Sequence, residues 1–373
     1  MSKAIYIGSS DLARKLSKCY VGDGNNLARK ATKWYIGDVN GLARLGYSAE
    51  RVPVITYRGL LSSSLTQYAS CIACTYCPSG NIGLFGGGKT RTSMTSRVTG
   101  YNTSLTQLSG VADLSYSVYG LMATYTPHYM LFGGGRIDTS GTAISAMNAY
   151  NTSGTKFSCA SLSSSRSFRG ATSIGEYALI GGATINCFND ALTNSVLPSS
   201  PANTNNCTAT SIGNYALFAG GGTDVDAYSS SLVWSSAPQL SYARTNLASA
   251  SGYSHALFLG GYDSEYLFTR ADAYTSSLSK VTCPELINGR YDAAAASQFG
   301  CVLLGGGVQY GGSLAQSTES YSDALTLAQQ DNIQLGRESP CALGMNGYVL
   351  FGGGSSGSTY YSSVEYFMIR LSA

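Results

Sequence analysis

Two short motifs in this 373-residue chain carry residue types that can perform chemistry. Cys71, Cys74 and Cys77 form a Cys-x-x-Cys-x-x-Cys run, a spacing that could offer three thiolates to a metal ion. The segment 86–90 reads Gly-Gly-Gly-Lys-Thr and ends as phosphate-binding loops end. A metal site still needs a fourth ligand, and a phosphate loop needs a helix behind it. The elements around each motif therefore decide whether it acts.

The glycines of the second motif belong to a repeat. An apolar run followed by Gly-Gly occurs seven times, and the glycine common to all copies recurs every 38 to 48 residues. These glycines are Gly87, Gly134, Gly182, Gly220, Gly260, Gly306 and Gly353. Self-similarity at such a period is typical of propellers and solenoids, so the sequence predicts seven copies of one structural unit.

Two further patterns keep step with the glycines. Upstream lies a run of small residues, such as 293–296, which suits an inner strand where seven strands converge on an axis. In several copies an arginine introduces this run; these are Arg166, Arg244, Arg290 and Arg337. Downstream, an aromatic residue, two or three Ser, Asn or Asp residues and then an apolar residue form a tight turn, as in 101–105. Each repeat is therefore predicted to supply four strands.

The order of arginine, small inner strand, apolar strand ending in Gly-Gly and aromatic turn resembles the kelch repeat over residues 52–373. The resemblance implies an all-β fold, a seven-bladed kelch-like β-propeller with four-stranded blades. The chain departs from the kelch pattern in its shorter period and in the outermost strand, where the kelch tryptophan is present at Trp234 alone. We therefore expect a propeller over residues 51–373 and a separate module over residues 1–50.

The last repeat needs help to complete its blade. The segment 364–371 supplies a third strand and leaves no residues for a fourth, whereas Leu61–Gln67 matches the turn and fourth-strand pattern of 104–107. We expect the N-terminal segment to complete the last blade, because such closure removes open sheet edges and locks the ring.

A shorter repeat, with a period of 14 to 15 residues, occupies residues 3–47. Each copy opens with Tyr-Ile-Gly or Tyr-Val-Gly, passes a turn and ends in Leu-Ala-Arg, which predicts three small β-hairpins. The residues assigned to this module are Tyr6, Arg14, Tyr20, Arg29, Tyr35 and Arg44. The repeat resembles those at the start of many tail and virion proteins of phages and prophages of Gram-positive bacteria. That resemblance implies an assembly module that binds other virion proteins; a stabilising β-extension without a partner is the alternative.

The repeat assigns the candidate catalytic residues to the scaffold. The three cysteines of the first motif fall on the inner strand of the first blade, and we expect the ten cysteines of a domain folded in a cytosol to remain free thiols. His128 and His255 occupy strand positions that hold Tyr177 and Tyr215 in other blades. No helix is expected after the Gly-Lys-Thr segment. We therefore predict no enzymatic activity, no cofactor and no metal site.

Composition excludes further classes of partner. Charged residues are only 12% of the chain, and the net charge of +3 is too small to predict binding to nucleic acid. No stretch approaches the roughly 20 apolar residues of a membrane span, so we predict no membrane insertion. The first residues lack the apolar region of a signal peptide, which favours synthesis in a cytosol.

The loops after the glycine pairs are the remaining candidates for function. They vary in length, are rich in tyrosine and charge, and would emerge on one face of the ring. The candidate binding residues are Arg136, Asp138, Tyr262, Asp263, Tyr266, Tyr310, Tyr360 and Tyr361. We expect a non-enzymatic phage virion protein of the tail, baseplate or fibre, made in the bacterial cytoplasm and displayed to bind a host-surface glycan or protein. The alternatives are a cytoplasmic kelch-type interaction adaptor, a capsid decoration protein, a propeller hydrolase or lyase, and loops that are merely solvated.

Overall fold

The computed structural model describes residues 20–22, 28–30, 33–37, 43–48, 53–182, 184–198 and 206–372. The chain separates into two compact units, Met1–Val52 with Ser372–Ala373, and Pro53–Leu371. In the described part of the second unit, the secondary structure consists of strands and one 3-10 turn, η1 (Tyr310–Gly312).

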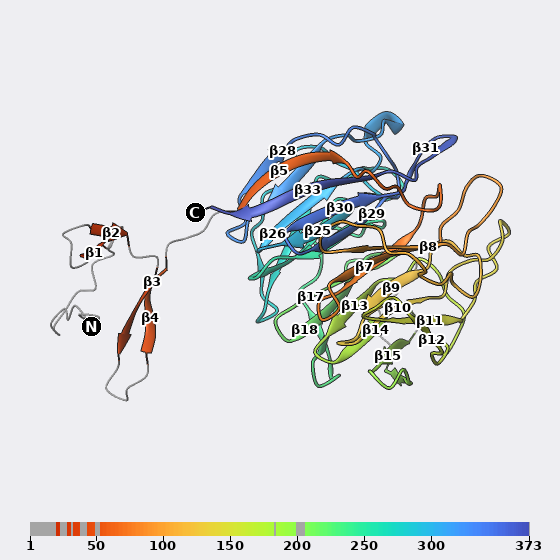
Figure 1. Cartoon of the computed structure of the whole chain (residues 1–373), viewed down its shortest axis with the longest axis horizontal. Helices are drawn as coiled ribbons and strands as arrows, with labels where there is room; N and C mark the ends of the chain where they lie inside the picture. Colours follow the sequence, from red (N-terminus) through yellow and green to blue (C-terminus); the bar gives the residue numbers. More distant parts are fainter. Residues whose placement is uncertain are drawn as a thin grey trace. The chain divides into compact units, whose positions relative to one another are not determined.

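Seven antiparallel sheets form the blades of the second unit (Figure 1). From the inner to the outer strand, blade 1 is β6 (Ala73–Cys77), β7 (Ile82–Gly86) and β8 (Val98–Asn102); blade 2 is β9 (Met122–Tyr125), β10 (Tyr129–Gly133), β11 (Met147–Asn151) and β12 (Lys156–Phe157); blade 3 is β13 (Ala171–Ile174), β14 (Tyr177–Ile180), β15 (Ile185–Phe188) and β16 (Asn194–Leu197); blade 4 is β17 (Thr208–Ile212), β18 (Tyr215–Ala219), β19 (Val225–Ser229) and β20 (Trp234–Ala237). Blade 5 is β21 (Ala248–Ser251), β22 (His255–Leu259), β23 (Ala271–Thr275) and β24 (Lys280–Val281); blade 6 is β25 (Ala294–Gln298), β26 (Cys301–Gly305), β27 (Thr318–Tyr321) and β28 (Leu327–Gln330); blade 7 is β29 (Cys341–Met345), β30 (Tyr348–Gly352), β33 (Val364–Leu371) and β5 (Pro53–Leu60).

The inner strands make a closed ring. Each contacts the inner strand of the next blade, and β29 of blade 7 contacts β6 of blade 1. The predicted seven-bladed β-propeller is therefore confirmed. Blade 1 differs from the predicted four strands, because its outermost strand is reduced to a single bridge between Tyr101 and Gln107.

The N-terminal segment completes the last blade, but the predicted strand was misplaced. The pairing strand is β5, which lies antiparallel to β33, and Figure 1 shows β5 in orange beside β33 in blue. The run Val54–Tyr57 is rich in β-branched and aromatic residues, which favour a strand. Leu61–Gln67 instead forms the irregular connection to blade 1, held by bonds such as that from Leu61 N–H to Val364 O at 2.8 Å.

A disulfide crosses the same junction. Cys74 on β6 and Cys341 on β29 are bonded, with Cα atoms 6.2 Å apart, so the prediction of free thiols is wrong for this pair. The physical reason is that ring closure brings two inner strands together from opposite ends of the propeller, at a Cα separation that a disulfide can span. The described cysteines that form no disulfide are Cys71, Cys77, Cys159, Cys187, Cys207, Cys283 and Cys301.

In six of the seven blades, the described backbone bonds show that the glycine pair joins its blade to the next one. In blade 5, Gly260 and Gly261 have φ angles of 63° and 98°, which favour glycine. A Cβ on Gly260 would lie 2.3 Å from the backbone oxygen of Arg290, which introduces blade 6. The N–H of Gly261 donates to that oxygen at 2.8 Å, and the N–H of Gly354 donates likewise to Ala69 O at 2.9 Å, linking blade 7 to blade 1. The repeated glycine is therefore a contact between blades as well as a turn.

A second set of backbone bonds surrounds the axis. Two or three positions before each inner strand, one residue has a positive φ between 48° and 59°; these residues are Cys71, Gly120, Phe168, Asn206, Asn246, Asp292 and Ser339. In six of the seven, the N–H donates to the carbonyl of its counterpart in the preceding blade, and the bond from Cys71 N–H to Ser339 O joins the two ends of the ring.

The predicted aromatic turns also bind neighbouring blades. Five buried tyrosines donate their phenol O–H to a carbonyl beyond the outer strand of the preceding blade at 2.7 to 2.9 Å: Tyr101, Tyr150, Tyr228, Tyr274 and Tyr321. The prediction that the apolar residue of the turn starts the next strand is wrong. This residue has a left-handed φ of 57° to 63° at Leu105, Leu192, Leu232, Leu278 and Leu325, and its side chain packs on a core of the preceding blade. Partial burial of this leucine helps to offset the backbone strain.

The arginines that introduce the inner strands are buried framework residues. Arg244 pairs with Asp272 at 2.7 Å and also donates to Gly260 O at 2.7 Å. The same ion pair is formed by Arg290 with Glu319 and by Arg337 with Glu365. Arg166 lacks a carboxylate partner among the described residues and donates instead to backbone carbonyls, including Gly181 O at 2.9 Å.

The first unit is described as two strand pairs. β1 (Tyr20–Gly22) pairs with β2 (Ala28–Lys30), and β3 (Lys33–Gly37) pairs with β4 (Ala43–Ser48), both antiparallel. These pairs contain Tyr20, Arg29, Tyr35 and Arg44, one on each strand; the first predicted hairpin, with Tyr6 and Arg14, lies outside the described residues. In the described part of the chain, no helix has the length and apolar character needed to cross a membrane.

Candidate functional site

The loops that follow the glycine pairs connect the second strand of each blade to the third. Because neighbouring strands are antiparallel, all these connections open on one side of the ring, which we call the glycine face. The loops are short in blades 3 and 4 (181–184 and 220–224) and long in the other five blades (87–97, 134–146, 260–270, 306–317 and 353–363). All eight predicted binding residues lie in the long loops.

Four of those eight residues line one cavity, which we call the loop-face pocket. It has a volume of about 440 Å³ and lies between the long loops of blades 5 and 6. Tyr262, Asp263 and Tyr266 come from blade 5 and Tyr310 comes from blade 6. Its size is within the range of small-ligand sites. The structure thus brings the predicted tyrosines of two blades together.

Local hydrogen bonds shape the blade 5 side of this pocket. Asp263 Oδ1 accepts the backbone N–H groups of Glu265 and Tyr266 at 2.8 and 2.7 Å, so the carboxylate holds the loop in a tight turn. The Tyr262 ring packs on Tyr291 with ring centroids 4.6 Å apart. The Tyr266 side chain is 63% exposed and Tyr310 is 90% exposed, so two aromatic faces are open to a ligand.

The charge of the loop-face pocket is acidic. Asp263 and Glu265 are the charged residues of its lining. Carboxylates accept hydrogen bonds from hydroxyl or amine groups and repel anions. Together with open tyrosine rings, they suit an uncharged or amine-bearing ligand with hydroxyl groups and an apolar face.

The other four predicted residues make different contacts. Arg136 donates from Nε to Ser167 Oγ at 3.1 Å and lies over the Phe168 ring, 5.2 Å from its centroid. Asp138 accepts the Thr142 N–H at 2.8 Å, and this hydrogen bonding lowers the pKa of its exposed carboxyl. Tyr360 lies on β32 (Thr359–Tyr360), which pairs with β31 (Ser355–Ser356).

Tyr361 belongs to the framework of the last blade. Its ring covers the guanidinium of buried Arg337 at 5.3 Å, and its backbone bonds to Gly354 and Ala69. This residue and the other three predicted positions outside blades 5 and 6 do not line the loop-face pocket.

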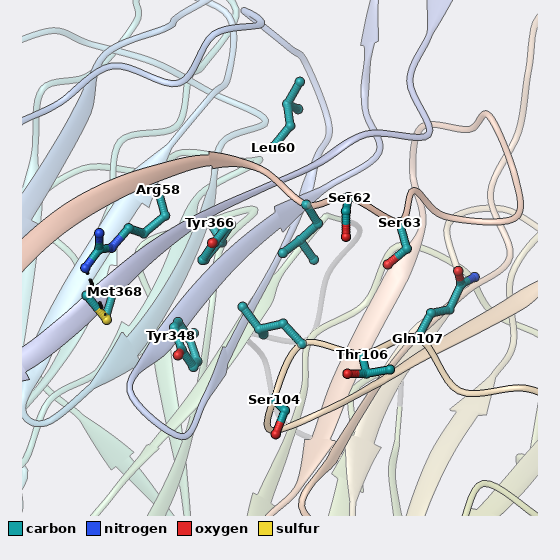
Figure 2. Close-up of a pocket in the computed structure, with 12 residues that line it drawn as sticks. Arg58, Leu60, Ser62, Ser63, Ser104, Thr106, Gln107, Tyr348, Tyr366 and Met368 are labelled. Carbon is teal, nitrogen blue, oxygen red and sulfur yellow. Dashed lines mark hydrogen bonds between the residues drawn. The ribbon is translucent and has the colours of Figure 1, made fainter.

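A second cavity lies where the first and last blades meet, and we call it the seam groove (Figure 2). It has a volume of about 800 Å³. One wall is formed by Arg58 and Leu60–Ser63, at the end of β5 and beyond it. The others are Tyr348, Tyr366 and Met368 of blade 7 and the turn Ser104–Gln107 of blade 1. None of these residues was singled out as a candidate for function from the sequence, because the groove exists only once β5 has joined the last blade.

A titratable acid lies at the axis on the glycine face. Asp292 is one of the seven positive-φ residues and accepts a hydrogen bond from Asn246 Nδ2 at 2.7 Å. Burial, with a smaller contribution from the charge of Glu338, raises the pKa of Asp292 to about 6. Its neighbour Tyr291 contacts Tyr262, which links this acid to the loop-face pocket.

The residues that suggested other chemistry lie in the framework. His128 is in the turn before β10, not on the strand as predicted, and its Nδ1 pairs with Asp190 Oδ2 of blade 3 at 2.7 Å. Cys71 also precedes its predicted strand, and Lys89 lies over the Tyr119 ring at 4.5 Å. Among the described residues, no three His, Cys, Asp or Glu side chains gather where they could hold a metal ion.

Comparison with known proteins adds support for the fold. No family model matches the chain, and no curated protein matches it in sequence. A solved structure titled "Structure of YjhT" superposes with a TM-score of 0.56 at 11% identity, covering 72% of this chain and 99% of that one. At this identity the similarity concerns architecture, and the architecture is a seven-bladed kelch-like β-propeller.

Proposed function

We propose that this chain is a non-enzymatic phage virion protein whose propeller is displayed to bind a glycan on the host surface. The observation that carries the binding part is the loop-face pocket, where Tyr266 and Tyr310 expose their rings beside Asp263 and Glu265. A rigid ring that presents tyrosine-rich loops on one face is suited to recognition. The virion part is supported by the resemblance of the basic Tyr-Ile/Val-Gly repeats in residues 3–47 to phage tail proteins.

The acidic lining narrows the expected ligand. An uncharged or amine-bearing saccharide can stack its apolar face on Tyr266 or Tyr310 and donate hydroxyl hydrogens to Glu265. An acidic saccharide would be repelled by the two carboxylates of the pocket.

The test is binding of the full chain to a glycan array and to purified host cell walls. The double variant Tyr266→Ala/Tyr310→Ala should lose binding by about tenfold or more, because the principal aromatic contacts are removed. Tyr253→Ala is the matched control, since Tyr253 is 68% exposed and lies in the turn between β21 and β22, on the opposite face of blade 5. Equal binding by wild type and the double variant would rule out the loop-face pocket.

The virion assignment has its own test. Mass spectrometry of purified particles should find the full chain, and a variant lacking residues 1–50 should be absent from them. Neighbouring genes for tail, baseplate or capsid components are expected. A protein found in host cytoplasm and absent from particles would instead support the interaction adaptor.

A further inference from the structure

The seam groove results from the unusual length of the closing strands. β5 and β33 each have eight residues, whereas the third strands of the other blades have four or five and the described fourth strands have two to four. Blade 7 therefore presents a longer outer ribbon than its neighbours, and this ribbon faces the turn Ser104–Gln107 of blade 1 across the groove. The groove is thus a property of ring closure and is separate from the loop-face pocket.

A β-bulge directs Arg58 to this groove. Tyr366 pairs with Gly59 and Phe367 pairs with Tyr57, so Arg58 is an extra residue on β5 without a partner on β33. Gly59 has a φ of 90°, which permits the irregularity. Among the strand pairs described in the propeller, this is the one that carries a register shift. Bulges commonly redirect a side chain next to a functional site.

Arg58 brings a positive charge that the groove does not neutralise. Among the described residues, its guanidinium has one polar contact, from Nη2 to the Met368 sulfur at 3.7 Å. The residues that line the groove include no aspartate or glutamate. The acid of the same strand pair, Glu365, is buried and is engaged by Arg337 and by the Tyr57 hydroxyl.

The remaining lining supplies groups that recognise a sugar. Tyr348 and Tyr366 have ring centroids 5.9 Å apart, and Figure 2 shows them between Arg58 at one end of the groove and Ser62, Ser63 and Gln107 at the other. Hydroxyl and amide groups can bond to sugar hydroxyls, aromatic rings can contact an apolar sugar face, and an arginine fork binds a carboxylate or phosphate. We propose that the seam groove is a second binding site, for a saccharide that carries an anionic group held by Arg58.

The experiment is calorimetric titration of the full chain with three probes: digalacturonic acid, its uncharged methyl ester, and glucose 6-phosphate. Wild type should bind at least one of the two anionic probes, and the more tightly bound one shows whether a carboxylate or a phosphate is preferred. Arg58→Gln should weaken anionic binding by about tenfold or more, because a charge-assisted hydrogen bond is lost. Arg58→Lys should retain part of it. Arg91→Gln is the control, because it removes an equal charge from an exposed residue on the glycine face.

Other results would overturn the proposal. These are the absence of binding by both anionic probes, equal affinity for digalacturonic acid and its ester, or unchanged affinity in Arg58→Gln. Because Arg58 is exposed, its variants should melt as the wild type does, and a melting curve verifies this. The variant Tyr266→Ala/Tyr310→Ala should bind the anionic probes as the wild type does. The proposal for the seam groove can therefore be tested even if the proposal for the loop-face pocket fails.

Discussion

The loop-face pocket and the seam groove differ in charge and in the elements that build them. The loop-face pocket is formed by loops and contains Asp263 and Glu265. Hydrogen bonds from nearby backbone N–H groups to the Asp263 carboxylate shape it. The groove is built around two long strands whose residues Arg58 and Met368 are 310 positions apart in sequence, and its charged residue is Arg58. The same ring can therefore present sites of opposite polarity, one that depends on a local turn and one that depends on closure.

The two sites should respond differently to substitutions at the junction of blades 7 and 1. The pocket should survive changes at the junction of blades 7 and 1 as long as the ring stays folded, because its contacts lie within blades 5 and 6. The groove should not, because its walls come from both sides of that junction. Variants placed at matched positions in blades 5 and 7 separate the two cases.

The largest effect is expected at the buried ion pair of blade 7. Glu365→Gln leaves the Arg337 charge buried without a counter-ion and weakens the bond to Tyr57 on β5. Removing one partner of such a pair typically costs about 3–5 kcal/mol of the free energy of unfolding. Asp272→Asn, which breaks the equivalent pair with Arg244 in blade 5, should cost a similar amount. Urea denaturation measures both.

Ligand binding by these two variants should then be measured under conditions in which both are folded. Glu365→Gln should weaken digalacturonate binding to the seam groove, because β5 is less firmly held, and Asp272→Asn should leave it unchanged. If both variants weaken that binding equally, the groove is not specific to the closing strands.

The next largest effect is expected at the disulfide that joins the inner strands of blades 1 and 7. Reduction with a phosphine, or the double variant Cys74→Ser/Cys341→Ser, should lower the free energy of unfolding by about 2–4 kcal/mol, because the unfolded chain loses its cross-link. Reductant should not destabilise the double variant further, and Cys187→Ser, at a buried free thiol, should respond to reductant as the wild type does. Peptide mapping without reductant should recover Cys74 and Cys341 linked; a wild type indifferent to reductant would contradict the cross-link.

The repeat made much of the fold predictable from sequence. Gly-Gly and the tyrosine turn each satisfy a local backbone requirement that few residues can meet, so both leave a regular trace in the chain. The loops that hold Tyr262, Asp263, Tyr266 and Tyr310 could be located from the sequence for a related reason, because they directly follow those glycines. By contrast, the seven positive-φ residues around the axis include cysteine, phenylalanine and serine, so residue type does not predict their positions.

Features of closure were less predictable. The strand β5 was misplaced because Leu61–Gln67 has the local pattern of a turn and strand, while the competing segment Pro53–Leu60 gains its pairing from β33, far away in sequence. The disulfide was missed for the same reason, since Cys74 and Cys341 are 267 residues apart and meet only in the closed ring. A bulge directs Arg58 to the groove, and the only sign of this bulge in the local sequence is the neighbouring Gly59.

The smallest effect is expected from the ionisation of Asp292, which should make the free energy of unfolding depend on pH. Burial raises the pKa of Asp292 to about 6, above its value of about 4 in an unfolded chain. The folded state thus binds the proton more tightly, so this residue contributes stability that is complete below about pH 4 and is lost as the pH rises through about 6. The difference is on the order of 3 kcal/mol.

Asp292→Asn keeps the acceptor for Asn246 Nδ2 and cannot ionise, so it should become more stable relative to wild type as the pH rises from 4 to 7. Urea denaturation across that range measures this. Asp138→Asn should show no such trend between pH 4 and 7, because hydrogen bonding lowers the pKa of that exposed carboxyl and its contribution to stability changes only below about pH 4. Asp292 does not line the seam groove, so binding there should not follow the Asp292 titration. A groove affinity that tracks this titration would show that the two regions are coupled through the ring.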